Sequence, residues 1–301
     1  MFHRFSVLRR THVCSHLAPQ DEASSRGARR LLSTRAPAGL TLVELMAAMT
    51  ILAMVVGTLG VLSKGVQETY QYAEDYSTVT QHARVALERI AAAVRQASAS
   101  EQFPGAIVLA DEAGSWRFPD TLVVWRPEGR PADAEGLPRF NELVVFCPHP
   151  AAPNRLLEIT VPGDTRTVPP VENEAQWIAE IEAIKRSNSV RQVTLTGLVR
   201  TAATLQSSES EPSSGSLRGA VRFETRLRPS AVEWTDYQDD KLGWDELAWV
   251  QGIFGSQTGL RQVWVRTELQ LVPADRAADD STAVEPIPFF GSAALYYEMH
   301  Q

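Results

Sequence analysis

The stretch AGLTLVELMAAMTILAMVVGTLGVL, from Ala38 to Leu62, is apolar except for Glu44. Residues 40–62 form a run of 23. At about 1.5 Å per residue, a helix of this length exceeds the roughly 30 Å of hydrocarbon in a bilayer. A cleaved secretory signal has a shorter apolar core and a small-residue cleavage site directly after it, whereas SKGVQETYQ follows here. We therefore predict a transmembrane helix over 40–62.

The helical pattern continues beyond residue 62. No proline occurs between Leu40 and Phe103, and the less polar residues recur at steps of mostly three and four. These residues are Val66, Tyr70, Ala73, Tyr76, Ala83, Leu87, Ile90, Val94 and Ala97. The spacing predicts an amphipathic helix over 63–99 with one face to bury. Together the two segments form one nearly continuous helix, on the order of 90 Å long.

Short apolar runs separated by turn-forming residues follow Pro104. They predict strands at 106–110, 121–126, 142–147, 155–161, 191–198, 219–228 and 260–272, and a helix at 172–186. Apolar and polar residues alternate in 219–228 and 260–272, which is typical of antiparallel strands with one solvated face. The expected fold class is α+β, a long N-terminal helix packed on an antiparallel β-sheet domain over 100–301.

The intervening segments give weaker signals. Polar linkers are expected at 126–139, 206–219 and 273–288, because each lacks an apolar run. For the tail from Phe289, two outcomes stay open, since its apolar residues either dock on the domain or fray.

Charge is divided unevenly along the chain. Residues 1–39 hold seven arginines against Asp21 and Glu22, a net charge of +5, and the whole chain carries −7, so the remaining residues carry −12. A basic segment before a membrane helix predicts a cytoplasmic amino end. An acidic body argues against nucleic acid as a partner. Residues 1–39 show no apolar period and are expected to form a flexible leader.

The two cysteines give little sign of chemistry. Cys14 and Cys147 lie on opposite sides of the predicted membrane segment, so no disulfide is expected. The spacing in HVCSH (12–16) is not a standard zinc pattern. Cys147 stands two residues before His149, a poor geometry for a catalytic dyad. We expect no cofactor and no enzymatic activity.

One acidic stretch, WTDYQDDKLGWDE at 234–246, offers weak calcium candidates in Asp236, Asp239 and Asp240. It lacks a defined ligand loop such as the EF-hand pattern. A solvated acidic loop is the alternative interpretation.

The segment GLTLVEL, Gly39 to Leu45, combines a glycine, the start of an apolar helix and a glutamate five residues after the glycine. This combination resembles the N-terminal motif of the type IV pilin-like proteins, which include type IV pilins and the pseudopilins of type II secretion. The matching residues are Gly39, Thr41, Leu42, Val43, Glu44 and Leu45. Leu40 stands where the family usually has phenylalanine. Residues 86–98 and 261–271 are further similar to the larger minor members, the J-type minor pseudopilin or the W-type minor pilin.

The resemblance implies that a prepilin peptidase cleaves after Gly39 and that the new amine of Leu40 is methylated. It implies a structural subunit of the inner membrane, with a periplasmic C-terminal domain, that helps to initiate or cap a filament. The implied partners are other pilin or pseudopilin subunits, the prepilin peptidase and an inner-membrane assembly platform.

Within this picture, Glu44 is expected to serve assembly. An ionised carboxylate at membrane depth costs about 2.5–3.5 kcal/mol, so it usually has a functional partner. Cleavage creates a positive amine at Leu40. Glu44 of one subunit is therefore expected to pair with the Leu40 amine of its neighbour and so set the axial register. The alternative is that Glu44 only extends to the nearby membrane interface.

Several questions stay open from the sequence. The 39-residue leader is far longer than the family's usual one, and no methionine lies between Met1 and Met46, so both a genuine long leader and a start-site error are compatible with it. Cleavage would leave 262 residues, which is large for the J type, while the very large K type typically lacks the glutamate. A membrane-anchored periplasmic enzyme or binding module is the alternative function. The sequence does not distinguish secretion, motility, adhesion and DNA uptake.

Overall fold

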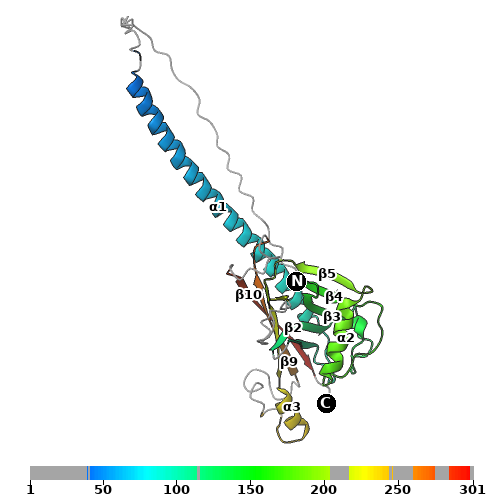
Figure 1. The fold of residues 1–301 in the computed structure, drawn as a ribbon. Coiled ribbons are helices and arrows are strands. Elements are labelled where there is room, and N and C mark those ends of the chain that lie inside the picture. The colour runs from blue at the N-terminus through cyan, green and yellow to red at the C-terminus, as the bar shows by residue number, and fades with distance from the viewer. Residues whose placement is uncertain are drawn as a thin grey trace, which may run out of the picture. The chain divides into compact units, whose positions relative to one another are not determined.

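The computed structural model describes residues 39, 41–113, 116–203, 217–243, 246, 260–274 and 285–298. The chain divides into two compact units, one ending at Val61 and the other beginning at Leu62. The helix α1, Leu42–Arg95, begins in the first unit and ends in the second. All other helices and strands belong to the second unit (Figure 1).

The helix α1 ends at Arg95, although the sequence predicted an end near Ala99. The backbone N–H of Ala97 bonds to the carbonyl of Val94 at 3.2 Å, which tightens the last turn. The N–H of Ser98 then bonds to the carbonyl of Trp125 at 2.8 Å instead of continuing the helix. Pairing with the sheet therefore replaces the last predicted turn.

Five consecutive strands form the larger sheet, and each pairs with the next in antiparallel orientation. They are β1 (Ala106–Ala113), β2 (Trp116–Trp125), β3 (Leu143–His149), β4 (Ala152–Thr160) and β5 (Arg191–Thr196). The short 3-10 helix η1, Phe140–Glu142, precedes β3. All side chains of Leu122–Trp125 are buried, so both faces of this sheet are covered.

The helix α2, Glu174–Arg186, covers one of these faces (Figure 1). It begins at the N-cap Asn173, whose side chain accepts a hydrogen bond from the backbone N–H of Gln176 at 3.3 Å. Its apolar positions enter a core with alternate residues of β1–β4. Members of this core include Trp177, Ile181, Ile184, Val123, Trp125, Val145, Cys147, Leu157 and Ile159.

The second half of α1 covers the other face and also packs on a second sheet. This sheet has the order β10-β9-β8 and contains β8 (Val221–Arg228), β9 (Leu260–Leu271) and β10 (Ile287–Glu298). The shared core contains Val79, Ala83, Ala86, Ile90, Ala93 and Val94 of α1, with Leu122, Val124, Val144, Phe146, Leu156, Phe223, Val263, Val265, Leu269 and Leu295. From Val79 onward, α1 thus lies between the inner faces of two antiparallel sheets, and the predicted α+β class is confirmed.

The predicted alternation in β8 and β9 is also confirmed. Val221 and Phe223 are buried while Arg222 is exposed, and Val263 and Val265 are buried with Arg266 exposed beyond them. The second sheet therefore has one face on α1 and one face in solvent.

The structure contains elements that the sequence did not predict. The tail forms the strand β10, and the expected linker 273–288 ends where this strand begins. The helix α3, Ala231–Gln238, occupies part of the expected acidic loop. A small sheet pairs β6 (Thr201–Ala203) with β7 (Leu217–Gly219), so the expected linker 206–219 ends in a strand.

Candidate functional site

The start of α1 is closed by a reciprocal pair of side chains, Thr41 and Glu44. The backbone N–H of Thr41 donates to Glu44 Oε2 at 3.0 Å, and the Thr41 hydroxyl donates to the same oxygen at 3.1 Å. In return, the backbone N–H of Glu44 donates to Thr41 Oγ1 at 3.3 Å. The N–H of Leu45 bonds to the Thr41 carbonyl at 3.1 Å. This arrangement is a capping box, which satisfies backbone donors that the first turn of a helix leaves unpaired.

The capping box gives Glu44 a role within its own chain that the sequence analysis did not predict. The signal was present, because Thr-x-x-Glu before an apolar run is the sequence pattern of such a cap. In the isolated chain the carboxylate of Glu44 therefore accepts two hydrogen bonds and also lies at the positive end of the helix dipole. Both interactions reduce the cost of holding the carboxylate near a membrane.

The other residues of the motif are exposed. Gly39, Leu42, Val43 and Leu45 all lie on the surface of the isolated chain. No other atom lies within 4 Å of the position that a Cβ would take at Gly39. Leu40 lies outside the described residues, as do residues 1–38 with the expected leader and HVCSH.

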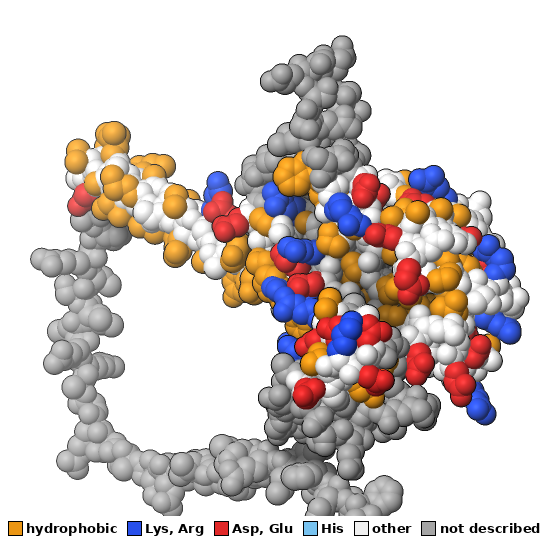
Figure 2. Space-filling model, turned by 90° about the horizontal axis from the view of Figure 1, so that it is seen from below, with side chains coloured by type: hydrophobic (Ala, Val, Ile, Leu, Met, Phe, Trp, Pro, Cys, Tyr) orange, Lys and Arg blue, Asp and Glu red, His pale blue; other side chains and the backbone are white. Residues whose placement is uncertain are grey.

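The exposed surface extends far beyond the motif. Every residue from Thr41 to Thr78 is exposed, and the first part of α1 is covered with hydrophobic side chains (Figure 2). Among the residues that the structure describes, one helix, α1, is long and apolar enough to cross a membrane. Near the N-terminus, such a helix fits a single-pass membrane anchor.

The amphipathic face predicted from Val66 is only partly buried. Val66, Tyr70 and Tyr76 are exposed, and the first buried residue of the helix is Val79. The expectation that the whole helix after residue 62 buries one face is therefore wrong for the isolated chain. The physical reason is that the two sheets supply packing partners to α1 only from Val79 onward.

The acidic stretch is only partly the solvated loop that the sequence suggested, because α3 takes its first residues and residues 239–241 form an exposed turn. Asp236 belongs to α3, Asp239 is its C-cap and Asp240 adopts a positive φ of 58°. The Lys241 ammonium lies 3.4 Å from Asp236 Oδ1 and 2.8 Å from Asp239 Oδ2. A lysine therefore takes the position between the two carboxylates. In the described part of the chain, no three His, Cys, Asp or Glu side chains gather as a metal site.

Cys147 and His149 do not form a nucleophile and base in contact with solvent. Cys147 is fully buried under α2, and burial raises the pKa of its thiol to about 12. His149 Nδ1 accepts hydrogen bonds from the backbone N–H groups of Ala151 and Ala152, both at 3.0 Å. A thiolate nucleophile needs a depressed pKa and access, and this cysteine has neither.

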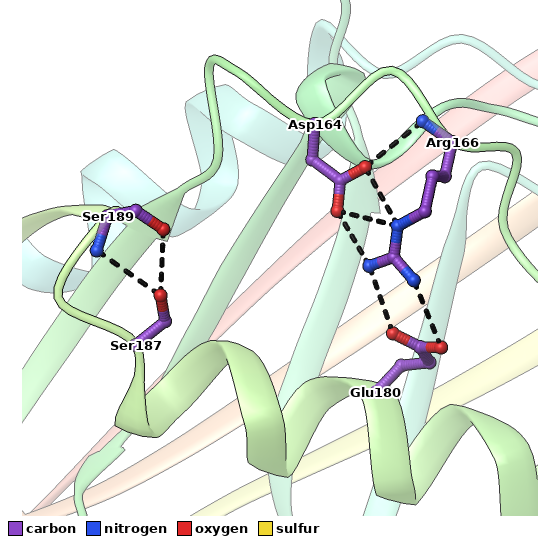
Figure 3. A network of polar contacts seen from close by, with 5 residues as sticks. All are labelled: Asp164, Arg166, Glu180, Ser187 and Ser189. Carbon is purple, nitrogen blue, oxygen red and sulfur yellow. Dashed lines mark hydrogen bonds and ion pairs between the residues drawn. The ribbon is translucent and has the colours of Figure 1, made fainter.

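A polar network joins the loop after β4 to α2 (Figure 3). Arg166 Nη2 lies 2.7 Å from Asp164 Oδ2 and 3.2 Å from Glu180 Oε2. The Arg166 guanidinium also lies over the Phe140 ring, 4.9 Å from its centroid. A cavity of about 460 Å³ is lined by Asp164, Arg166 and Glu180 together with Ser187 and Ser189. Because the charges satisfy one another, the network acts as a link between loop and helix.

Residues 34–60 match the family model described as the prokaryotic N-terminal methylation motif. This motif is the type IV pilin signature, and the long apolar helix that follows fits it. No curated protein and no solved structure shows a significant match to the chain.

Proposed function

We propose that this chain, which carries the type IV pilin signature at residues 34–60, is a structural subunit of a pilus-like filament. The finer proposal is a minor pseudopilin or minor pilin that helps to initiate or cap a type II secretion pseudopilus or a type IV pilus. In this role it is not an enzyme, and it uses neither a cofactor nor nucleic acid.

The observation that carries the proposal is the exposure of every residue from Thr41 to Thr78. The apolar part of this surface, residues 41–62, is covered in any stable state of the protein, because exposing it to water is unfavourable. Lipid covers residues 40–62 of a subunit that waits in the inner membrane. Helices of neighbouring subunits cover the same residues, and Tyr70 and Tyr76 beyond them, after assembly.

The glycines of α1 support helix packing between subunits. Apart from the nearby backbone of α1 itself, no atom of the protein lies within 4 Å of the Cβ position at Gly57, Gly60 or Gly65. These glycines have no packing role within the described chain, although glycine in a helix costs up to about 1 kcal/mol. Small residues allow close approach of helices in membranes, and contact with a neighbouring α1 accounts for them.

The proposal assigns the processing steps to the first residues of the motif. A prepilin peptidase cuts after Gly39 and methylates the Leu40 amine, while Thr41, Leu42, Val43 and Leu45 complete the recognised motif. The leader 1–39 stays cytoplasmic, residues 63–99 continue the membrane helix 40–62, and the domain 100–301 is periplasmic. An inner-membrane assembly platform then draws the subunit into the filament.

Glu44 then has two successive sets of partners. In the free subunit its carboxylate accepts hydrogen bonds from Thr41. In the filament it also pairs with the Leu40 amine of a neighbour. A carboxylate has acceptor sites for both kinds of partner, so the cap need not open for the pair to form.

Two variants separate the charge of Glu44 from its capping. Glu44→Gln keeps a side-chain oxygen that accepts from Thr41 but removes the charge, whereas Thr41→Val removes the capping hydroxyl and keeps the charge. We expect Glu44→Gln to insert and be cleaved normally, yet to enter filaments about tenfold less, because a neutral amide cannot neutralise the neighbour's amine. Thr41→Val should enter at close to the wild-type level.

The measurement is the fraction of subunit recovered with sheared filaments by immunoblot, relative to the membrane pool. Wild-type incorporation of Glu44→Gln would reject the charge pair. A defect in Thr41→Val as large as that in Glu44→Gln would instead assign the role to helix capping.

A further inference from the structure

The solvated face of the β8–β9–β10 sheet carries a regular grid of arginine, glutamate and aromatic side chains. Antiparallel pairing aligns them in rows, with one residue from each strand. The rows are Arg222–Glu268–Phe290, Glu224–Arg266–Ser292, Arg226–Trp264–Ala294 and Arg228–Gln262–Tyr296. We name these twelve residues the arginine–aromatic face. The opposite face of the same sheet is buried against α1.

Arginines lie against the aromatic rings of this face. The Arg226 guanidinium lies 5.7 Å from the Trp264 ring centroid, and the Arg266 guanidinium lies 5.3 Å from that of Phe290. Phe290 is nevertheless 56% exposed and Tyr296 is 48% exposed. Large aromatic side chains and arginines are the residue types that most often anchor protein–protein interfaces. The face therefore has the composition of an interface core.

The face differs in charge from the rest of the body. Its four arginines against two glutamates give a net charge of +2, whereas residues 40–301 together carry −12. The remainder of this region therefore carries −14. Opposite potentials across an interface steer association and fix its orientation. An acidic protein surface is thus the complement of this face.

We infer that the arginine–aromatic face docks an acidic surface of a neighbouring pilin-like subunit. Phe290 and Tyr296 enter apolar pockets on the partner, and Arg226 and Arg266 meet its carboxylates. The inference rests on the proposed function only for the class of the partner. This contact lies between globular domains and is separate from the packing of α1.

The arrangement of charges favours a protein over a lipid surface. Segments that bind anionic lipid gather about four to eight basic residues in one cluster. Here Glu224 pairs with Arg226 at 2.8 Å, and Glu268 stands between Arg222 and Phe290. Alternating positive and negative side chains complement a protein partner that has fixed charges of its own. A uniformly anionic membrane would instead repel the glutamates of this face.

The test is photocrosslinking in cells that produce the full-length chain with its native assembly system. A benzophenone amino acid replaces Ser292, which is exposed on the edge strand β10 within the face, or Asn188, an exposed control position after α2. We expect Ser292, and not Asn188, to crosslink a protein that carries the same N-terminal methylation motif. The crosslinked peptide should be rich in Asp and Glu.

Matched substitutions then test which side chains carry the contact. Arg266→Glu and Phe290→Ser should each lower the crosslink yield about tenfold, the effect of losing one interface anchor. The controls Arg186→Glu and Trp116→Ser make the same changes at exposed positions elsewhere and should leave the yield unchanged. Changing the crosslinked carboxylate of the partner to lysine should restore the yield of Arg266→Glu.

Three outcomes would overturn the inference. They are crosslinks from Ser292 to lipid alone, a yield no higher than that from Asn188, and a protein partner without the motif. Cleavage between residues 39 and 40 is scored in the same cells. Normal cleavage with any of these outcomes would reject the docking face while leaving the proposed function intact.

Discussion

Glu44 illustrates how one residue can be recognised from sequence while part of its role is missed. Its place five residues after Gly39 in an apolar helix predicts a function. The bonds to Thr41 add a local role that follows from helix chemistry alone. The partner expected in a filament belongs to another chain, and therefore a single chain cannot define that geometry.

At Cys147, burial predicts low reactivity. It is the one cysteine in the sequence after Gly39, and burial raises the pKa of its thiol to about 12. Near pH 8 the thiolate is therefore scarce. We expect the processed protein to show no fast reaction with Ellman's reagent when folded and one thiol per chain in concentrated guanidinium chloride. Rapid labelling of the folded protein would contradict the packing under α2.

The Asp164–Arg166 pair predicts a pH dependence of stability (Figure 3). Hydrogen bonds from Arg166 hold the pKa of Asp164 below its ordinary value of 3.8. Because the folded pKa is depressed, the pair stabilises the fold above the unfolded pKa, and this stability is lost as the pH falls through the folded value. Asp164→Asn should lower the free energy of unfolding by about 1 kcal/mol or less near neutral pH, since Arg166 is exposed.

The difference between Asp164→Asn and wild type should shrink as the pH falls below 3.8. Urea unfolding at a series of pH values measures it. A difference that grows toward acid would show that the carboxylate has the opposite effect.

At the scale of elements, α1 is joined to the larger sheet by a buried carboxylate. Glu158 on β4 accepts hydrogen bonds from Arg89 of α1, from Nε at 2.7 Å and from Nη2 at 2.9 Å. Arg126 adds a weaker contact at 3.6 Å. The side chain of Glu158 is only 4% exposed, so its negative charge is balanced by these arginines rather than by water. The pair therefore fixes the position of α1 over β4.

Arg89→Met should destabilise the fold by about 2–3 kcal/mol, because a buried charge loses its main partner. The double variant Arg89→Met/Glu158→Met should recover most of this loss. Arg84→Met, at an exposed site of the same helix, should change stability by about 0.5 kcal/mol or less. Urea unfolding of the detergent-solubilised chain, followed by tryptophan fluorescence, measures all three. A double variant that is no more stable than Arg89→Met alone would contradict the coupling.

The elements that could be predicted from sequence are those with a strong period. The strands β8 and β9 and the helix α2 have one, and each lies close to its predicted range. The strand β3 was found instead as a continuous apolar run, and β2 begins at Trp116, before its predicted start at residue 121. The strand β10 was missed because Gly291 and Ser292 interrupt its apolar pattern. In the fold, a Cβ at Gly291 would lie 2.9 Å from Leu87 Cδ2. The glycine thus allows α1 to approach the sheet, a reason that depends on tertiary structure.

The helix α3 was also not predicted from the sequence. Ser230 and Glu233 form a capping box at its start, but the acids that follow favoured an acidic loop in the sequence interpretation. The pairing of Lys241 with Asp236 and Asp239 shows how these acids are satisfied in the fold. Local charge alone did not reveal this arrangement.

At the scale of the whole molecule, the chain presents two surfaces that its own described residues leave exposed. One is α1 from Thr41 to Thr78, and the other is the arginine–aromatic face. The first requires lipid or other helices, and the second has the chemistry of a protein contact. A subunit that works only when assembled explains both surfaces, whereas a membrane-anchored enzyme explains only the apolar part of α1.

The central claim is that this chain becomes a filament subunit through cleavage after Gly39. The most direct measurement is mass spectrometry of the N-terminal peptide of the protein purified from its native membrane. We expect a peptide that begins at Leu40 and carries a methyl group on its amine, and we expect this peptide to be lost when the host's prepilin peptidase is deleted. An intact bond between Gly39 and Leu40 in the mature membrane protein would contradict it.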